Sequence, residues 1–358
     1  MEAFTDPWRP RDAAWLARPQ STFAGLPGRP LLVGGCPRSG TTLLRAILDN
    51  HPELAMPVET NFVLPLWHER SAFGDLRRED ARRAVGEWIF AGKGRGGKRI
   101  RGDMPVAESV ARCAAAGPTL GSVLAACFAL YAERTGKPRW GDKRPRYAMY
   151  PGVLFDLFPD AQFVNVVRDP RGAVASQIPM GWDESEVALE ASLANWELSV
   201  RRVDDLAARL RPDQLLDVRY EDLVRDPAAE LARICAFAGL AAGDAVTAML
   251  DAPRHGKRSE AEHQFVRDID PGRITGWSER LDPAAIALVE HVAAPWLERF
   301  GFLPIANAEI DARSLAEFDR QRKARRARLR RVALRELGRR VTYRRPVAAP
   351  AGSGARSS

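Results

Sequence analysis

The chain has 358 residues, of which 46% are hydrophobic and 28% charged, and this ordinary composition excludes a wholly disordered protein. No stretch reaches the roughly 18 consecutive apolar residues of a membrane-spanning helix, and the first residues lack the apolar segment of a secretory signal. The formal net charge is +8, but thirteen Lys or Arg and a single acid lie between Arg320 and Arg345. Since Arg356 adds one more positive charge, residues 1–319 carry a net charge of −5, and the basic character belongs to the C-terminal segment.

The cysteines favour a reducing compartment. Their spacing matches neither a disulfide framework nor a metal site. Together with the missing signal segment, this predicts a cytoplasmic protein, and the basic segment allows peripheral attachment to a membrane. The four cysteines are Cys36, Cys113, Cys127 and Cys235.

Apolar periodicity predicts strands and helices in alternation. A short apolar run closed by two glycines predicts a buried strand over residues 30–35, and residues 163–167 and 215–218 predict two more. Strands that alternate with helices predict an α/β fold in which helices flank a parallel central sheet. Helices are expected directly after residue 167 and at residues 42–50, 60–69, 78–90, 105–115, 119–134, 184–210, 227–237 and 284–300.

Composition divides the chain into four segments. The Gly/Lys/Arg-rich stretch 92–102 is predicted to be a mobile loop, and residues 251–280 are polar and irregular. We expect a lead-in over residues 1–28, one folded domain over 29–305, a basic helical extension over 306–345 and a disordered end over 346–358.

The most informative segment, GGCPRSGTTLL, runs from Gly34 to Leu44 between the first strand and the first helix. This is the context of a phosphate-binding loop. Gly35 and Gly40 frame four residues, and glycines let backbone N–H groups approach an anion while the helix N-terminus adds positive potential. The hydroxyl groups of the two threonines that follow Gly40 are further donors.

The loop departs from that of ATP- and GTP-hydrolysing enzymes. The usual lysine after the second glycine is replaced by Thr41, and the cation is Arg38, inside the loop. Arg168 also intervenes before Asp169, so the second strand does not end in a magnesium-binding carboxylate. These features predict a site for a phosphosulfate or a phosphodiester without an obligatory metal. The alternative is a kinase-like enzyme that uses ATP.

Three stretches resemble one enzyme family. The segment VGGCPRSGTTLLRAILDNHPELAMPVET, beginning at Val33, is similar to the 5′-phosphosulfate loop region of P-loop-like sulfotransferases, above all tyrosylprotein sulfotransferases and their bacterial relatives. The resemblance recurs at residues 165–177 (NVVRDPRGAVASQ) and 219–227 (RYEDLVRDP) and covers residues 30 to 300 in patches. It implies a sulfotransferase that uses 3′-phosphoadenosine 5′-phosphosulfate (PAPS), requires no metal, and transfers the sulfuryl group to a hydroxyl-bearing acceptor.

The resemblance also implies how the donor is bound. The family's loop arginine, matched by Arg38, contacts the phosphate that bears the sulfuryl group and stabilises the charge on the leaving oxygen. An Arg and a Ser at the spacing of Arg168 and Ser176 hold the 3′-phosphate in this family, and a guanidinium fork suits that dianion. Arg171 is a further neighbour, with a surface arginine as the alternative. The remaining nucleotide contacts implied are Ser39, Gly40, Thr41 and Thr42 to the 5′-phosphate, Tyr220 near the adenine, and Arg267 and Arg273 closing over the 3′-phosphate.

Two further residues are implied in the chemistry. Glu59 occupies the position of the family's catalytic carboxylate, which would accept the proton of the acceptor hydroxyl. Lys143, in WGDKRPR, matches the lysine that assists at the sulfuryl group; the alternative is a surface ion pair with Asp142. None of the five histidines is preferred as base, and His51 is expected to be structural.

The acceptor class is narrowed by one departure. Tyrosine-sulfating enzymes carry an Arg two residues after the catalytic Glu, where this chain has Asn61. We therefore expect a small molecule, glycan or lipid as acceptor, with peptide tyrosine as the alternative.

The basic extension has apolar residues loosely at helical spacing, which predicts a basic amphipathic helix. The simplest interpretation is a solvated terminal helix. The alternative is a module that contacts an anionic membrane surface or nucleic acid, although no specific nucleic acid is expected.

Overall fold

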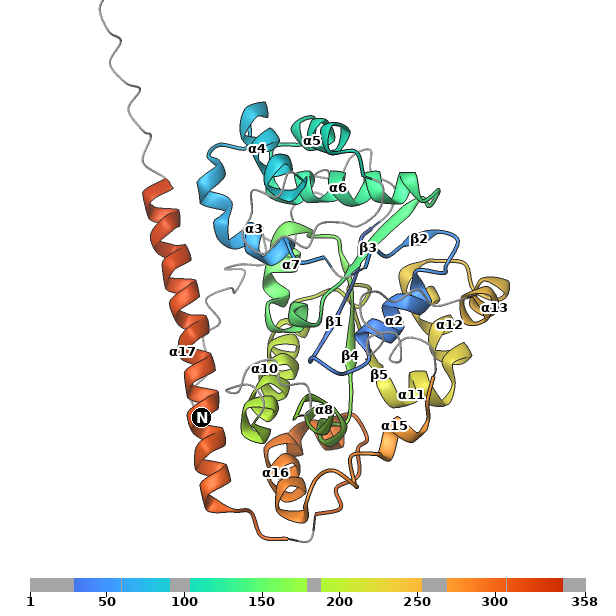
Figure 1. The fold of residues 1–358 in the computed structure, drawn as a ribbon, viewed down its shortest axis with the longest axis vertical. Helices are drawn as coiled ribbons and strands as arrows, with labels where there is room; N and C mark the ends of the chain where they lie inside the picture. Colours follow the sequence, from blue (N-terminus) through green and yellow to red (C-terminus); the bar gives the residue numbers. More distant parts are fainter. Residues whose placement is uncertain are drawn as a thin grey trace, which may run out of the picture.

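The structure is a computed structural model that describes residues 29–58, 60–90, 104–178, 188–252, 269–306 and 308–343, with backbone alone for residues 332–343. Its centre is a sheet of five parallel strands in the order β2-β3-β1-β4-β5 (Figure 1). The predicted parallel α/β fold is therefore confirmed. The strands are β1 (Leu31–Gly35), β2 (Leu54–Ala55), β3 (Arg139–Lys143), β4 (Gln162–Val167) and β5 (Leu215–Arg219).

The sheet is covered on both faces because its strands alternate their side chains. Leu31 and Val33 of β1 pack into one apolar cluster with helices α2, α11, α12 and α13. Leu32 points to the opposite face and packs with α3 to α7 and part of α10. The helix bounds are α2 (Thr41–Leu48), α3 (Val63–Glu69), α4 (Glu79–Phe90), α5 (Val106–Ala114), α6 (Leu120–Arg134), α7 (Pro151–Leu157), α8 (Pro170–Gln177), α10 (Leu189–Ala207), α11 (Tyr220–Arg225), α12 (Pro227–Ala238), α13 (Asp244–Asp251), α15 (Gly272–Thr275) and α16 (Pro283–Arg299), with 3₁₀ turns η2 (Arg70–Phe73) and η3 (Pro145–Met149).

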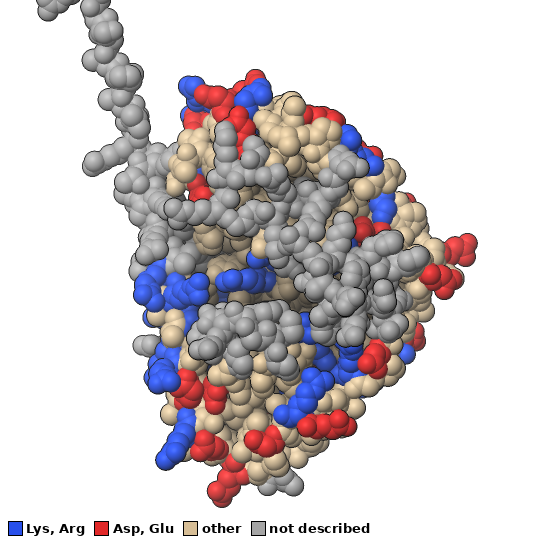
Figure 2. Space-filling model, in the orientation of Figure 1, with Lys and Arg blue, Asp and Glu red and all other residues tan. Residues whose placement is uncertain are grey.

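The basic extension forms the helix α17 (Ala312–Tyr343), which lies along α10 (Figure 1). Phe318 and Leu329 of α17 are only 2% and 5% exposed, so the helix is docked rather than solvated on all sides. Lys and Arg side chains recur along this edge of the molecule (Figure 2). Within the part of the chain that the structure describes, no helix combines the length and the apolarity that crossing a membrane needs. The fourfold division of the chain remains a prediction.

Polar contacts fix α17 on α10 as well. The Asn195 side-chain oxygen accepts a hydrogen bond from Arg325 Nε at 2.7 Å, and the buried Glu197 carboxylate lies 3.3 Å from Arg326 Nη2. Between these two residues, the indole of Trp196 points inward and donates to the carbonyl oxygen of Arg168 at 3.1 Å. One turn of α10 therefore contacts both the C-terminal helix and the end of β4.

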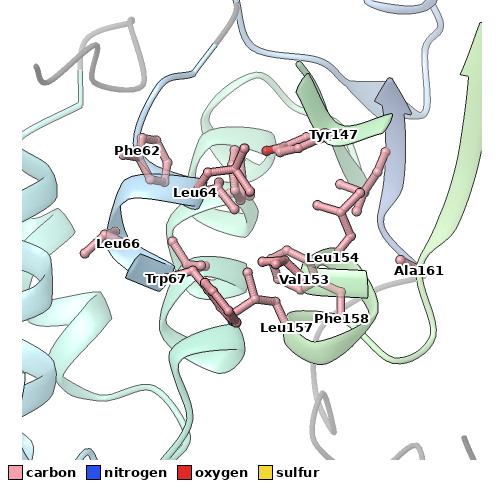
Figure 3. Packing of buried hydrophobic residues seen from close by; sticks show 14 of the residues in the cluster. Phe62, Leu64, Leu66, Trp67, Tyr147, Val153, Leu154, Leu157, Phe158 and Ala161 are labelled. Carbon is pink, nitrogen blue, oxygen red and sulfur yellow. The ribbon is translucent and has the colours of Figure 1, made fainter. Parts of the chain in front are cut away.

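A packed apolar cluster holds the carboxyl end of β3 in place. Figure 3 shows Tyr147 of η3 in one cluster with side chains of α3, such as Leu64, and of α7, such as Leu154. Tyr147 is fully buried, and its hydroxyl donates to Asp142 of β3. The cluster thereby sets the positions of Asp142 and the adjoining Lys143.

All four cysteines are buried and unbonded. The Sγ atoms of Cys113 and Cys127 lie 3.0 Å apart between α5 and α6. The sequence spacing gave no sign of this contact, because it depends on how the two helices pack.

Candidate active site

The loop between β1 and α2 has a tight, left-handed backbone. A Cβ atom at Gly35 would lie 2.4 Å from the carbonyl oxygen of Val166, and one at Gly40 would lie 2.4 Å from the ring of Tyr220. Gly40 has a φ of 93°, and Arg38, with a φ of 71°, is the one non-glycine residue with positive φ in the described part of the chain. Such a conformation costs about 1–3 kcal/mol and is concentrated at functional sites.

The structure brings Arg38, Arg168 and Ser176 into contact. Arg38 Nε donates a hydrogen bond to Ser176 Oγ at 3.1 Å, and Arg168 Nη1 donates to the carbonyl oxygen of Arg38 at 2.9 Å. Arg168 Nη2 donates to the carbonyl oxygen of Arg273 at 2.7 Å. Residues from the loop, the end of β4, the end of α8 and α15 therefore meet at one place, beyond the carboxyl ends of β1 and β4, where open parallel sheets bind their ligands.

These arginines form a desolvated cluster of positive charge. The pKa of Arg38 is lowered to about 10, mainly by burial and in addition by repulsion from Arg168, Arg273 and Arg280. Burial also lowers the pKa of Arg168. At neutral pH Arg38 remains charged, so the cluster favours an anion that would share its charge.

The cluster contains a hydrogen-bond donor without a partner among the described residues. Arg168 Nε is buried and has no hydrogen-bond partner among the described residues, although both terminal nitrogens of the same side chain are engaged. The Ser39 hydroxyl is likewise buried without a partner in the described region. Buried donors without a partner are costly, and a bound anion is one kind of group that would satisfy them.

Tyr220, at the start of α11, forms one wall of this site. The Arg168 guanidinium lies 4.4 Å from the centre of the Tyr220 ring, and the same ring covers Gly40. Burial raises the pKa of Tyr220, while the positive charge of Arg168 opposes that rise. The ring therefore joins the loop to Arg168, a contact that the predicted role near the adenine did not include.

Lys143 approaches the loop from the neighbouring strand. The parallel pairing of β3 with β1 sets Lys143 level with Val33, and its Nζ lies 3.3 Å from Thr42 Oγ1. Lys143 is only 1% exposed, so it is not half of a surface ion pair. Thr42 is exposed at the first turn of α2, whereas Thr41 is buried.

Asp142 belongs to a network that sequence reasoning missed. Its Oδ2 accepts hydrogen bonds from Thr60 Oγ1 at 2.9 Å and from the Tyr147 hydroxyl, and Arg144 Nη1 donates to the Thr60 carbonyl at 2.9 Å. Burial raises the pKa of Asp142 to about 6 although these hydrogen bonds lower it. The network clamps Thr60, which directly follows Glu59 in the chain. No local pattern in the sequence signals this network, because its members come together only in the folded chain.

Arg171 has a structural position. Its guanidinium donates to both carboxylate oxygens of Asp169, at 2.9 and 2.6 Å, and to Glu290 at 2.5 Å. Only 4% of its side chain is exposed, so the alternative of a surface arginine is wrong. Arg171 ties α8 to α16 instead of reaching into the arginine cluster.

His51 is structural, as expected. Its Nδ1 accepts a hydrogen bond from the Glu53 backbone, which places the proton on Nε2, and Nε2 lies 2.9 Å from the carbonyl oxygen of Ala241. Glu59 and Arg267 lie outside the described residues, as does the stretch 92–102. Among the residues that are described, no three His, Cys, Asp or Glu side chains are grouped to hold a metal ion.

Comparisons with known proteins agree on one family. The sequence model of the Sulfotransferase family matches residues 30–244, more than half of the chain. Protein-tyrosine sulfotransferase A of Caenorhabditis elegans is 25% identical over 288 residues, which are 77% of this chain and 68% of the relative. Protein-tyrosine sulfotransferase 2 of Gallus gallus is 25% identical over 290 residues, which are 77% of this chain and 70% of the relative.

Solved structures support the fold. The sulfotransferase domain of the olefin synthase from Synechococcus PCC 7002 superimposes with a TM-score of 0.55 at 23% identity, covering 78% of this chain and 96% of that domain. At this identity the likeness concerns the arrangement of the sheet and helices.

The relatives correct one expectation. The predicted cytoplasmic location is contradicted. The relatives named above are protein-tyrosine sulfotransferases, and similarity to these enzymes does not support a cytoplasmic location. The cysteine spacing and the N-terminal residues, on which the prediction depended, do not decide the compartment.

The family match over residues 30–244 includes the loop for which the sequence predicts phosphosulfate chemistry. The chain belongs to the sulfotransferase family, and it is an enzyme that transfers a sulfuryl group from PAPS to a hydroxyl acceptor.

Proposed function

We propose that the arginine cluster is the donor site. Arg38 and the backbone amides of its loop would hold the 5′-phosphosulfate, and Arg168 with Ser176 would hold the 3′-phosphate. The observation that carries this proposal is the convergence of Arg38, Arg168 and Ser176, from positions up to 138 residues apart, in one desolvated positive site. The partnerless Nε of Arg168 is the donor that the 3′-phosphate would engage.

The residues around the loop suit in-line transfer. The acceptor oxygen forms a bond to sulfur as the bond from sulfur to the bridging phosphate oxygen breaks, which leaves adenosine 3′,5′-bisphosphate. Negative charge develops on that bridging oxygen, and Arg38 with Lys143 would stabilise it electrostatically. Glu59 would take the proton of the acceptor hydroxyl. The clamp of Asp142 and Arg144 on Thr60 supports this role, since it fixes the residue next to Glu59.

For the acceptor we favour the hydroxyl of a small molecule, glycan or lipid. Asn61 stands where a tyrosine-sulfating enzyme would carry an arginine, and its side-chain oxygen is buried without a partner among the described residues. A neutral side chain here gives an acidic peptide no counter-charge. Peptide tyrosine is the second candidate, because the relatives named above are protein-tyrosine sulfotransferases.

Titration calorimetry with adenosine 3′,5′-bisphosphate tests the donor site. We expect Arg38→Ala and Arg168→Ala each to weaken binding about 10- to 150-fold, since hydrogen bonds to charged groups contribute about 1.5–3 kcal/mol. Glu59→Gln should leave that affinity unchanged while turnover falls about 10²- to 10⁴-fold. Unaltered nucleotide affinity in both arginine variants would refute the assignment.

A panel of candidate acceptors tests the proposed acceptor class. With radiolabelled PAPS, we expect incorporation into alcohols, phenols, glycans or lipids in preference to an acidic tyrosine peptide. Preferential labelling of the peptide would establish the second candidate. Turnover of ATP with magnesium and no response to PAPS would favour a kinase instead.

A further inference from the structure

The outward face of α17 consists of basic residues and alanines. The inward face is occupied by contacts with α10, through Phe318, Leu329, Arg325 and Arg326. Every exposed position from residue 312 to residue 331 is an arginine, a lysine or an alanine. The exposed cations are Arg313, Arg320, Lys323, Arg328, Arg330 and Arg331, and the exposed alanines are Ala312, Ala316, Ala324 and Ala327.

The nearby acids compensate only part of this charge. Glu317 pairs with Arg320, and Asp319 pairs with Arg322, and both acids lie near the first half of the helix. From Lys323 to Arg331 the chain contains no acid at all. Figure 2 shows the resulting succession of positive side chains along the α17 edge.

The geometry of this face fits an extended array of negative charges. The cations from Arg313 to Arg331 spread over about 27 Å at 1.5 Å per residue. That span exceeds the screening length of about 8–10 Å at moderate salt, so a single bound anion would engage only part of the row. Because α10 covers the other side of α17, only one face of the helix is open to a partner. A single open face suits a flat surface better than a groove that must enclose the helix.

The side chains also separate a lipid surface from a nucleic acid. Base recognition relies on amides and aromatic rings as well as on arginine. The exposed positions between residues 312 and 331 hold none of these except arginine. The small alanines let the helix backbone come close to a surface, and each Lys or Arg near an anionic bilayer contributes about 1 kcal/mol.

We propose that the outward face of α17 binds the headgroup layer of an anionic phospholipid surface. The binding is electrostatic, since no large apolar side chain is exposed on the described part of this helix. It does not depend on the donor site, and the two assignments can fail separately.

Vesicle sedimentation tests the proposal on the full chain. Vesicles of phosphatidylcholine are compared with vesicles that contain about 30% phosphatidylserine, at about 0.1 M salt. We expect association with the anionic vesicles alone, weakening steeply as salt rises. Equal association with both vesicles, or none with either, would overturn the proposal.

Charge-removing variants test whether α17 is the surface that binds the vesicles. The triple variant Lys323→Gln, Arg328→Gln and Arg331→Gln should bind the anionic vesicles about a hundredfold more weakly, at about fivefold per cation. The charge-retaining triple variant Lys323→Arg, Arg328→Lys and Arg331→Lys should bind like the natural chain. A matched control removes three exposed arginines elsewhere: Arg77→Gln, Arg78→Gln and Arg83→Gln.

The control and a competitor complete the test. If the control variant lost as much binding as the α17 variant, net charge and not this face would be responsible, and the proposal would be wrong. It would also be wrong if a short DNA duplex, at equal phosphate concentration, bound the chain more tightly than the anionic vesicles. An unchanged melting temperature of the glutamine variant checks that it is folded.

Discussion

The guanidinium of Arg168 donates a hydrogen bond of 2.9 Å to the main-chain carbonyl of Arg38. The residue proposed to hold the 3′-phosphate is thereby attached to the backbone of the loop proposed to hold the 5′-phosphosulfate. The contact helps to hold Arg38 in its left-handed conformation, which would be costly in a free loop. The two proposed anion subsites are therefore joined in one preorganised unit.

Replacing Gly40 should disturb this unit. Gly40→Ala introduces a Cβ atom 2.4 Å from the Tyr220 ring, at a φ of 93°. We expect a lower melting temperature and weaker binding of adenosine 3′,5′-bisphosphate, because the loop and the ring must move apart.

Gly136→Ala is the matched control for Gly40→Ala. Gly136 has a φ of 70°, and a Cβ atom there meets nothing within 4 Å, so this variant carries the backbone cost without the clash. It should lose about 1 kcal/mol of stability and no nucleotide affinity. Equal nucleotide affinity in both variants would contradict the role given to the Gly40–Tyr220 contact.

Arg171→Gln should affect stability rather than donor binding. The change leaves the buried carboxylates of Asp169 and Glu290 without their cation. Breaking a buried ion pair in this way costs about 3–5 kcal/mol, and urea unfolding measures it. The folded fraction should bind adenosine 3′,5′-bisphosphate far better than Arg168→Ala does. Full stability with lost nucleotide binding would instead make Arg171 a ligand residue.

Asp142 should make stability fall as pH rises from about 4 to 6. Burial raises its pKa in the folded protein to about 6, above the value of about 3.9 in an unfolded chain. The folded state therefore binds more protons in this interval, so the contribution of Asp142 to the free energy of unfolding decreases with pH, by up to about 3 kcal/mol. Asp142→Asn removes this titration. The free energy of unfolding is measured against pH for the natural chain and for Asp142→Asn. The difference between the two proteins should change between about pH 4 and pH 6, and a constant difference would exclude a raised pKa of Asp142.

Removing residues 312–358 should destabilise the folded domain. The truncation uncovers the surface of α10 and withdraws Phe318 and Leu329, each of which contributes about 1.5–3 kcal/mol when buried. Thermal unfolding should report a melting temperature several degrees lower. The triple glutamine variant of α17 keeps both apolar contacts and should unfold within about 0.5 kcal/mol of the natural chain. Identical melting of the truncated chain would mean that α17 is not docked in solution.

The sequence predicted what local patterns encode. The strand at residues 30–35, the glycine loop and the following helix were predicted because apolar runs, glycines and helical spacing all lie within a few residues of each other. The structure confirms the parallel sheet, and it also contains two strands that the sequence did not reveal. The sequence of β3, RWGDK, is too polar to indicate a buried strand.

Distant partners explain what could not be predicted. The buried Arg139 of β3 is satisfied by the carbonyl of Arg29 and the side chain of Gln162, and Asp142 is satisfied by Thr60 and Tyr147. The same holds for α17, whose helical pattern was visible but whose contact with α10 spans about 130 positions. Residue types could suggest the site, whereas its connections depend on the tertiary fold.

Trp196 connects the C-terminal helix to Arg168 of the proposed donor site. Its indole donates to the carbonyl of Arg168, while the residues on either side of it hold two arginines of α17. If adhesion of α17 to a surface shifts this turn of α10 and changes nucleotide affinity by some factor, nucleotide must change adhesion by the same factor, because such coupling is reciprocal.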